Sequence, residues 1–527
     1  MIFHSRFPDV EIPEVSLAEF VIGHAARFGD RPALIDGPSG RTVTYAALAQ
    51  SVRSLAAGLA KRGFGKGDVL AVYSPNLPEY AAVLHAVAML GGITTTVNPL
   101  YTVRELGEQL SDAGASILIT VPPLLEPALE ASRKSGIEEV FVFGEAAGAT
   151  SFASLLQSDG RVPHVSIAPR TDVVVMPYSS GTTGLPKGVM LTHYNLVANI
   201  LQSEALFPVE LERVIAVLPF YHIYGLTVLL NISLHRGDTV VTMPRFDLEQ
   251  FLQLMQQYEV TRAYLVPPIV LALAKHPLVE KYNLSSLRSI NSGAAPLGES
   301  IEQACENRLH SFVAQGYGLT ETSPVVSTTP IDPAMRRAGS AGLLIPNTEC
   351  KVVDPASGAE LEANQQGEVW VRGPQVMKGY LNQPAATAAM LEPDGWLHTG
   401  DIGKVDQDGY LFIVDRLKEL IKYKAFQVAP AELESLLLKH PAVADAAVIP
   451  HPDPEAGEVP KAFVVMKGQA SPDELMAFVN EQVAPFKKIR LLEVVDQIPK
   501  SPAGKILRRT LIERERSAFP SPAGGGG

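Results

Sequence analysis

The chain has 527 residues, 46% of them hydrophobic, and a formal net charge of −12, which is a globular composition with length for about three domain-sized units. This acidic balance argues against a broad nucleic-acid-binding surface, because phosphate backbones are bound by basic footprints. The two cysteines, Cys305 and Cys350, form neither a disulfide framework nor a zinc motif, which favours a reducing, cytoplasmic compartment.

Neither the start of the chain nor its longest apolar run predicts a membrane segment. The opening "MIFHSRFPDVEIPE" carries acids and prolines where a secretion signal needs an apolar run. Residues 214–234 are uncharged and long enough to span a bilayer, but a proline, a histidine, a glycine and an asparagine interrupt them. We expect a short buried strand to Leu218, a turn carrying His222 and then a buried helix.

Two series of apolar strands alternate with amphipathic helices. The first has strands expected at 68–76, 93–99 and 116–121 and helices at 77–92 and 103–115. The second begins at Val214 and has further strands expected at 238–244 and 262–268 and helices at 248–260 and 301–309. This alternation predicts parallel sheets with right-handed crossovers, and therefore doubly wound αβ units.

The remainder of the chain changes character twice. Dense turn signals separate three short runs, 350–355, 367–373 and 409–415, which predict antiparallel strands of a small barrel-like unit. After Asp415 a charged connector leads into about a hundred residues of mixed helix and strand, a separate α+β domain. The division expected is a large domain at 1–414, a hinge at 415–418, a mobile cap at 419–515 and a flexible tail at 516–527.

The stretch "SSGTTGLPKG" (Ser179–Gly188) predicts a phosphate-binding loop. It lacks the Lys-Ser or Lys-Thr pair of the common P-loop, because Gly184 is followed by Leu185 and Pro186 before Lys187. We expect a strand before the loop and, after it, a helix with Thr192 as N-cap. Glycine, serine and threonine between these elements offer N–H groups and hydroxyls to an anion. A flexible linker is the alternative.

With this loop, six motifs occur in the order typical of the adenylate-forming (ANL) superfamily, which the chain resembles over nearly its whole length. The other five are "SGAAPLGE" (Ser292–Glu299), "QGYGLTET" (Gln315–Thr322), "GWLHTGDIG" (Gly395–Gly403), "DRLKELIKYKAFQVAPAELE" (Asp415–Glu434) and "PKSPAGKILRR" (Pro499–Arg509). Within the superfamily, "LPFYHIYGL", "MPRFDLEQFL" and "KYKAFQVAPAELE" are most similar to 4-coumarate–CoA ligases and their bacterial relatives.

The resemblance implies both a fold and a reaction. The fold is α/β: a large AMP-binding domain of two doubly wound αβ subdomains plus a small β-barrel subdomain, followed by a small mobile α+β domain. In the reaction, a carboxylate attacks the α-phosphate of ATP to give acyl-AMP and pyrophosphate, and coenzyme A then displaces AMP. The ligands implied are a small carboxylic acid, ATP, Mg²⁺ and coenzyme A, bound by a cytoplasmic monomer or homodimer without a transmembrane segment or nucleic acid.

The same resemblance assigns residues to the nucleotide. The β- and γ-phosphates are expected at Ser179, Ser180, Gly181, Thr182, Thr183 and Lys187. The adenine is expected at Ala294, Gln315, Gly316 and Tyr317, and the ribose at Asp401 and Arg416. Thr320 is expected at the α-phosphate, Glu321 at Mg²⁺, and Lys505 between the substrate carboxylate and the α-phosphate. Each of these residues taken singly is typical of a turn, a solvated surface or a core; their joint occurrence favours the functional interpretation.

Residues for the acid and for coenzyme A follow in the same way. The acid pocket is expected at Tyr224, Gly293, Gly318, Pro324, Val325 and Thr328, with His222 orienting the acid and admitting coenzyme A. Val228 stands where plant coumarate ligases typically have serine, and such an apolar wall also suits alkyl chains. Lys418 matches the hinge; Lys422 acts near the adenylate, and Arg245, Lys424, Ala425 and Gln427 near coenzyme A. A solvated charge run is the alternative for the lysines.

Several functions remain open at this point. A medium- or long-chain fatty acyl-CoA synthetase would use the same chemistry with a longer pocket. A luciferase-like monooxygenase would use its own adenylate, although no separate motif marks that activity. A nucleotide-binding module without ligase turnover belongs to a different class, and the intact Lys187, Glu321, Asp401 and Lys505 argue against it.

Ala425 departs from the family pattern, which usually has glycine at this position. A β-carbon there would crowd the close approach of the pantetheine arm of coenzyme A. We therefore expect Ala425→Gly to speed CoA-dependent turnover and to leave acid-dependent ATP–pyrophosphate exchange unchanged. The measurement compares acyl-CoA formation by the two chains, and equal rates would contradict the prediction.

Overall fold

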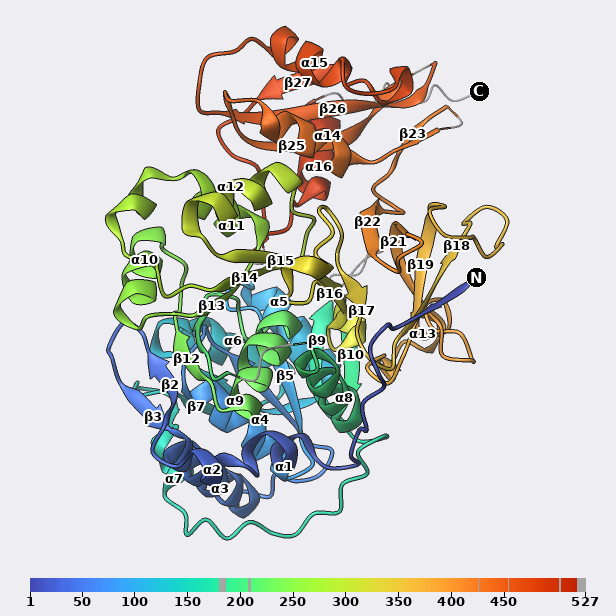
Figure 1. The fold of residues 1–527 in the computed structure, drawn as a ribbon. Helices are drawn as coiled ribbons and strands as arrows, with labels where there is room; N and C mark the ends of the chain where they lie inside the picture. The colour runs from blue at the N-terminus through green and yellow to red at the C-terminus, as the bar shows by residue number, and fades with distance from the viewer. Residues whose placement is uncertain (180–185, 207–209, 425, 454, 502–503, 519–527) are drawn as a thin grey trace.

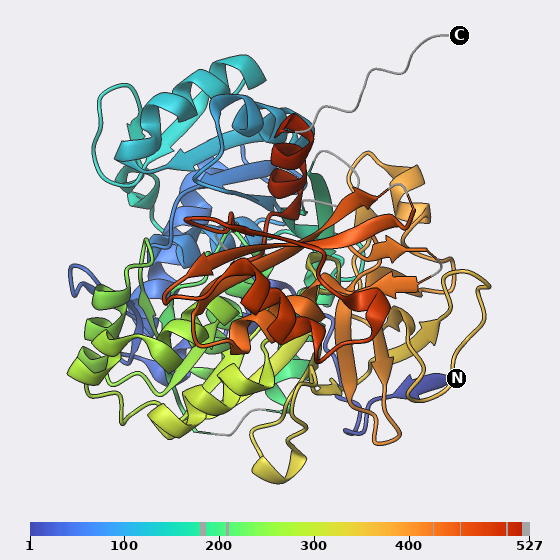
Figure 2. The same ribbon diagram turned by 90° about the horizontal axis from the view of Figure 1, so that it is seen from above.

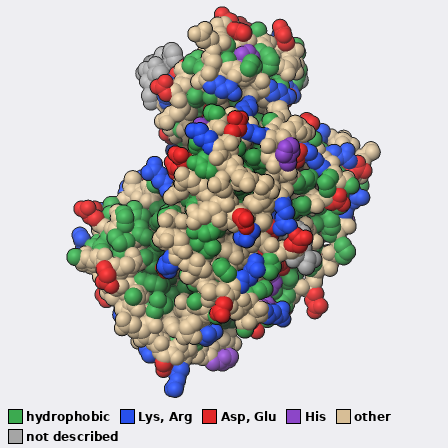
Figure 3. All heavy atoms as spheres, turned by 60° about the vertical axis from the view of Figure 1, so that its left-hand side comes forward, with side chains coloured by type: hydrophobic (Ala, Val, Ile, Leu, Met, Phe, Trp, Pro, Cys, Tyr) green, Lys and Arg blue, Asp and Glu red, His purple; other side chains and the backbone are tan. Residues whose placement is uncertain are grey.

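The computed structural model describes residues 1–179, 186–206, 210–424, 426–453, 455–501 and 504–518. Figure 1 shows a large N-terminal domain, with the C-terminal domain above it. The hairpin of β21 (Leu397–Val405) and β22 (Leu411–Arg416) leads from one to the other. From above, the C-terminal domain lies across the middle of the large domain (Figure 2). On the face in Figure 3 the C-terminal domain forms a distinct lobe, and basic and acidic side chains are scattered over the surface.

The first αβ subdomain is built on an eight-stranded sheet in the order β20-β10-β9-β5-β4-β6-β7-β8. Strands β4, β5, β6 and β7 pair in parallel, which confirms the doubly wound series expected from the sequence. The strands are β4 (Val69–Tyr73), β5 (Ile93–Val97), β6 (Ala115–Thr120), β7 (Glu139–Val142), β8 (Thr150–Ser151), β9 (Val173–Ser179), β10 (Lys187–Thr192) and β20 (Gly379–Tyr380). The helices are α3 (Tyr45–Lys61), α4 (Glu79–Met89), α5 (Val103–Ala113), α6 (Leu125–Ser135), α7 (Ala153–Leu156) and α8 (His193–Glu204).

The element that follows the phosphate-loop motif differs from the one predicted. Its described ends lie on β9 and β10, which pair antiparallel, so the segment joins two strands rather than a strand and a helix. Strand β10 lies between β9 and the edge strand β20, and α8 begins directly after it. Thr192 does cap α8: its hydroxyl accepts from the Asn195 N–H, and the Asn195 side chain accepts from the Thr192 N–H.

The second subdomain has a nine-stranded sheet in the order β17-β16-β15-β14-β13-β11-β12-β2-β3. Strands β11 to β15 pair in parallel, again as expected. The strands are β2 (Pro32–Asp36), β3 (Thr42–Thr44), β11 (Arg213–Ala216), β12 (Thr239–Thr242), β13 (Arg262–Leu265), β14 (Ser289–Ser292), β15 (Phe312–Gly318), β16 (Val325–Thr328) and β17 (Leu343–Leu344). The helices include α1 (Leu17–Ile22), α2 (Ala25–Phe28), α9 (Ile232–Arg236), α10 (Leu248–Gln257), α11 (Pro267–Lys275) and α12 (Glu299–Leu309).

The uncharged run 214–234 folds as a strand, a turn and a helix, as predicted. The strand β11 ends at Ala216, two residues before the expected end, and the helix starts as a π-helix, η2 (Tyr224–Asn231), that continues into α9. In this π-helix the Ile232 N–H bonds to the Thr227 carbonyl, five residues back. No helix in the described part of the chain is both long and apolar enough to cross a membrane.

The turn-rich region forms a five-stranded antiparallel sheet in the order β1-β18-β19-β21-β22. Its strands are β1 (Ile2–His4), β18 (Glu349–Val353), β19 (Gly367–Arg372), β21 (Leu397–Val405) and β22 (Leu411–Arg416). Strand β1 comes from the very N-terminus and was not predicted, because three residues carry too short a pattern. The short helix α13 (Pro384–Ala388) follows β20.

The C-terminal domain has its own sheet and two small apolar cores. Its strands are β23 (Ile421–Tyr423), β24 (Phe426–Val428), β25 (Val443–Asp453), β26 (Gly457–Met466) and β27 (Leu491–Val494), and its helices are α14 (Pro430–Lys439), α15 (Pro472–Asn480) and α16 (Arg508–Ala518). The Asp415 carboxylate, at the end of β22, accepts from the Ala431 N–H in the first turn of α14. The segment predicted as a hinge, 415–418, therefore begins inside a strand that is bonded to the small domain.

A buried ionic cluster joins α16 to the rest of that domain. The Arg508 guanidinium donates to both Glu434 carboxylate oxygens, at 2.7 and 2.8 Å, and also contacts the Glu419 carboxylate. Burial raises the pKa of Glu434 to about 7 even with Arg508 beside it. This carboxylate depends on Arg508 for its charge compensation.

Removing the arginine should destabilise the C-terminal domain strongly. Breaking a buried pair leaves an uncompensated charge, so we expect Arg508→Ala to lower the free energy of unfolding by about 3–5 kcal/mol. Arg509→Ala is the matched control, because Arg509 is exposed and pairs along its helix with Glu513; it should cost under about 1 kcal/mol. Urea unfolding followed by a probe in the C-terminal domain measures both. Equal losses would contradict the prediction.

Candidate active site

A cavity of about 1070 Å³ lies where the subdomains of the large domain meet the C-terminal domain. Residues from both αβ subdomains, from β22 and from the C-terminal domain line it. The sequence-predicted residues among them are Ser179, Lys187, His222, Tyr224, Gly293, Ala294, Gly316, Tyr317, Gly318, Thr320, Glu321, Pro324, Val325, Thr328, Arg416, Lys418 and Lys505, with Val228 beside them. Residues more than three hundred positions apart in the chain therefore share one site.

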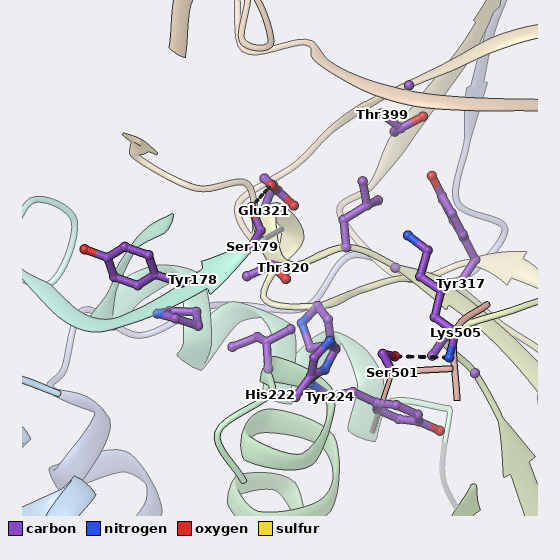
Figure 4. A pocket seen from close by; sticks show the side chains of 18 of the residues that line it. Tyr178, Ser179, His222, Tyr224, Tyr317, Thr320, Glu321, Thr399, Ser501 and Lys505 are labelled. Atoms are coloured by element: carbon purple, nitrogen blue, oxygen red, sulfur yellow. Dashed lines mark hydrogen bonds between the residues drawn. The ribbon is translucent and has the colours of Figure 1, made fainter. Parts of the chain in front are cut away.

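A buried carboxylate organises the expected phosphate end of the cavity. One Glu321 oxygen accepts hydrogen bonds from the Ser179 hydroxyl, at 3.0 Å, and from the Tyr380 hydroxyl, at 2.8 Å. The Lys187 ammonium lies 5.0 Å from the centre of the Tyr380 ring. Figure 4 shows Glu321, Ser179 and Thr320 together on one side of the cavity. Strand β9, strand β20 and the 3-10 turn Thr320–Thr322 meet at this carboxylate.

The expected ribose and adenine end is built on Asp401. Its carboxylate accepts from the Tyr317 hydroxyl at 2.7 Å, and the Arg416 Nε lies 3.5 Å from its other oxygen. Burial raises the pKa of Asp401, while Arg416 and Tyr317 act in the opposite direction. The hydrogen bond fixes the tip of Tyr317 and leaves its ring in the cavity lining, where a flat heterocycle can stack.

Lys505 enters the cavity from a turn of the C-terminal domain. The Ser501 N–H donates to the Lys505 carbonyl at 2.8 Å, and the Lys505 N–H donates to the Ser501 hydroxyl at 3.2 Å. The lysine side chain extends alongside Tyr317 (Figure 4). Burial and the neighbouring Arg416 lower the pKa of Lys505 to about 8, against the attraction of Glu419 and Asp401. The Lys505 ammonium can therefore bind anionic groups in the cavity.

His222 lies in the turn before the π-helix and faces the same cavity. Its Nδ1 accepts from the Tyr224 N–H at 3.3 Å. Burial and the charge of Lys505 lower the pKa of His222 to about 4. The imidazole is therefore neutral near pH 7, which suits orienting a substrate by hydrogen bonds.

Glycines shape the wall expected to hold the acid. A β-carbon on Gly318 would come 2.0 Å from the Pro324 carbonyl oxygen, so any other residue there would displace the wall. A β-carbon on Gly293 would lie 3.0 Å from the Tyr224 ring. The Tyr224 hydroxyl donates to the Asn291 carbonyl, which fixes the ring against β14.

Some predicted residues do not reach the cavity. Gln315 is buried behind it, where its side chain bonds to Leu297 and Glu302 and holds the loop after β14 to β15. Asp401 contacts the site through Tyr317 and Arg416. Lys422 and Lys424 are exposed on the C-terminal domain, and Arg245 is exposed after β12. The predictions for Ser180, Gly181, Thr182, Thr183 and Ala425, and for the side chain of Gln427, lie outside what the structure describes.

The structure also adds residues that the motifs did not indicate. Tyr380 was missed because it lies in "KGYLNQP", 59 residues after Glu321, and nothing in that pattern points to a carboxylate. Tyr264, Asn291, Ser292 and Ser203 line the cavity as well. Tyr264, Asn291 and Ser203 lie in strands or a helix, where the sequence shows only ordinary core periodicity, and Ser292 opens the motif "SGAAPLGE" but was assigned no role.

Comparisons with known proteins agree with this geometry. The model of the AMP-binding enzyme family matches residues 23–381, and that of the AMP-binding enzyme C-terminal domain matches 432–505. 4-Coumarate–CoA ligase 1 of Solanum tuberosum is 44% identical over 98% of this chain and 96% of its own length.

Two solved structures are similar over most of the chain. ATP-bound MatB from Rhodopseudomonas palustris superposes with a TM-score of 0.88 at 28% identity and covers 96% of this chain and 100% of its own. The anthranilate CoA ligase AuaEII in complex with anthranoyl-AMP gives a TM-score of 0.88 at 25% identity, covering 97% and 98%. Residues from the separate motifs line one cavity, and both family models and a relative of nearly full length match this sequence. The chain therefore belongs to the AMP-binding enzyme family of adenylate-forming (ANL) enzymes.

Proposed function

We propose that this chain joins 4-coumarate, or a related aryl or acyl carboxylic acid, to coenzyme A. The chain is an ATP-dependent acid–thiol ligase that forms an acyl adenylate first. The observation that carries the site assignment is the meeting of Thr320, Glu321 and Lys505 in one cavity. Three distant motifs supply a hydroxyl, a carboxylate and an ammonium where the two anionic reactants have to approach each other.

In the first step the chain offsets the repulsion between a carboxylate and a triphosphate. Lys505 lies between them and stabilises the charge that develops as the carboxylate oxygen attacks the α-phosphorus. Thr320 donates to the α-phosphate, and Lys187 binds the phosphates that leave as pyrophosphate. Tyr317 stacks on the adenine, and Asp401, which lies behind Tyr317 and Arg416, accepts from the ribose hydroxyls when they share or replace one of these partners. Neutral His222 holds the acid in line for attack.

The donor set around Glu321 fits Mg²⁺. This ion takes oxygen ligands and commonly uses one or two carboxylates together with substrate phosphates. Glu321 offers one carboxylate oxygen beyond the one that accepts from Ser179 and Tyr380. Among the described residues no three His, Cys, Asp or Glu side chains cluster as a self-sufficient metal site. Glu321 would therefore hold the ion together with the phosphates, and the ion would neutralise their charge.

The second step uses the other face of the C-terminal domain. With Lys505 in the cavity, Lys422 and Lys424 stay outside it, so the described arrangement is the one suited to adenylation. Rotation about residues 415–418 exchanges the two faces, and coenzyme A then approaches past His222 toward Lys424, Ala425, Gln427 and Arg245. The proposal also includes a division into a large domain at 1–414 and a mobile cap at 419–515. It places the protein in the cytoplasm as a monomer or homodimer.

A panel of carboxylates tests the proposed substrate. We expect 4-coumarate to give AMP and acyl-CoA with a higher kcat/KM than decanoate or palmitate. The apolar Val228 in the wall favours a fatty acid as the second candidate, which a preference for decanoate or palmitate would support. Absence of acid-dependent ATP–pyrophosphate exchange with every acid would instead indicate a nucleotide-binding module.

Replacing Lys505 tests its role in the first step. Loss of one charge aimed at the transition state typically costs about 10²- to 10³-fold in rate, so Lys505→Ala should lower acid-dependent ATP–pyrophosphate exchange by that factor. Lys439→Ala, an exposed lysine at the end of α14, is the control and should leave the exchange rate unchanged. A loss under threefold for Lys505→Ala would refute the assignment.

The pH dependence should follow the same group. A lysine is cationic below its pKa, and here the cation is the active form. The kcat/KM for the acid should therefore be highest below pH 8 and fall as the pH rises through about 8. Lys505→Arg keeps its charge, so its residual activity should lack this decline. His222, with a pKa near 4, should add no transition between pH 5 and 7. A decline that persists in Lys505→Arg would assign it to another group.

A further inference from the structure

Three polar side-chain atoms in the cavity lining are buried without a hydrogen-bond partner in the described structure. They are the Ser203 hydroxyl, the Asn291 side-chain oxygen and the Ser292 hydroxyl, in residues that are 1%, 6% and 2% exposed. Leaving a buried polar group unpaired costs about 1–3 kcal/mol. When such groups line a ligand cavity, a bound molecule is the natural source of the missing partner.

Ser203 lies on a helix face that already forms part of the acid pocket. One turn earlier on α8, Asn199 donates from its amide to the Val325 carbonyl at 2.9 Å and accepts from the Val325 N–H at 3.0 Å. Residues four apart in a helix lie on the same face, so Ser203 follows Asn199 along the pocket wall. Helix α8 also packs against the π-helix that carries Tyr224 and Val228.

The order of residues along the π-helix indicates which end of the acid Ser203 meets. His222 lines the cavity together with Lys505, so it marks the end where the carboxylate reacts. The chain then leads through Tyr224 to Val228, which also lines the cavity and has no hydrogen-bonding group in its side chain. Ser203 carries a hydroxyl and lies on α8, which packs against this π-helix.

We propose that Ser203 is a specificity-determining residue, which hydrogen-bonds a polar group at the end of the acid remote from the carboxylate. The inference rests on the acid–thiol ligase function proposed above. It names the class of acid: one that ends in a hydroxyl or a similar group, rather than an unbranched alkyl chain. A site with an unpaired buried hydroxyl discriminates strongly against an analogue of the same size that lacks the partner.

A pair of acids of matched size tests the proposal. 4-Coumarate ends in a phenolic hydroxyl, and 4-methylcinnamate has a methyl group at the same position. We expect kcat/KM in acid-dependent ATP–pyrophosphate exchange to favour 4-coumarate at least tenfold in the unaltered chain. Ser203→Ala should reduce that ratio by about tenfold and leave the KM for ATP unchanged. Ser203→Cys, nearly the same size but a weak hydrogen-bonding group, should reduce it similarly.

Ser233→Ala is the matched control. Ser233 is a buried serine on α9 whose hydroxyl also has no partner among the described residues, and it is absent from the cavity lining. Its removal should leave the ratio unchanged, which separates recognition of the acid from a general effect on packing. If both acids support exchange and Ser203→Ala keeps the original ratio, the role of Ser203 is refuted and the ligase function stands. If no acid supports exchange, both proposals fail.

Discussion

The site depends on one constraint: the Lys505 ammonium has to reach a cavity that belongs mostly to another domain. The C-terminal domain holds it there through several independent contacts. Gly504 lies so close to Val266 and Pro268 that a β-carbon on it would be 3.0 Å and 3.2 Å from their side chains. Asp415 bonds to the first turn of α14, and Arg508 contacts Glu419 near the connector. A lysine on a loose tail would lose side-chain and backbone freedom at every turnover.

Besides that ammonium, the site contains two carboxylates on separate elements and an arginine beside one of them. Glu321 and Asp401 lie on separate elements, each held by hydroxyl donors, and Arg416 stands beside Asp401. The site thus contains both positively and negatively charged side chains. Hydrogen bonds keep these groups apart and in place before substrates bind. Such preorganisation lets a protein that is acidic overall bind polyanions, because local fields outweigh net charge at short range.

Much of this architecture could be predicted from the sequence. The elements that could not be predicted were missed for physical reasons. The parallel sheets were predictable because buried strands and amphipathic helices alternate with clear periods. The strand β10 was missed because Lys187–Thr192 pairs only with distant partners, β9 and β20, and its glycine and lysine resemble a loop. The motif positions of Thr320, Glu321 and Lys505 were sufficient to place them in the cavity. Tyr380 and Ser203 were not predictable, because their roles arise only from tertiary neighbours.

The hydrogen bond between Tyr317 and Asp401 affects how tightly a nucleotide can be held. These two groups satisfy each other, so the carboxylate has a donor within the protein itself. In the binding mode proposed above, a ribose at Asp401 has to share or replace an existing partner. The free energy gained is then only the difference between two hydrogen-bonded states. Release of AMP is correspondingly easier, since the protein recovers its internal bond as the product departs.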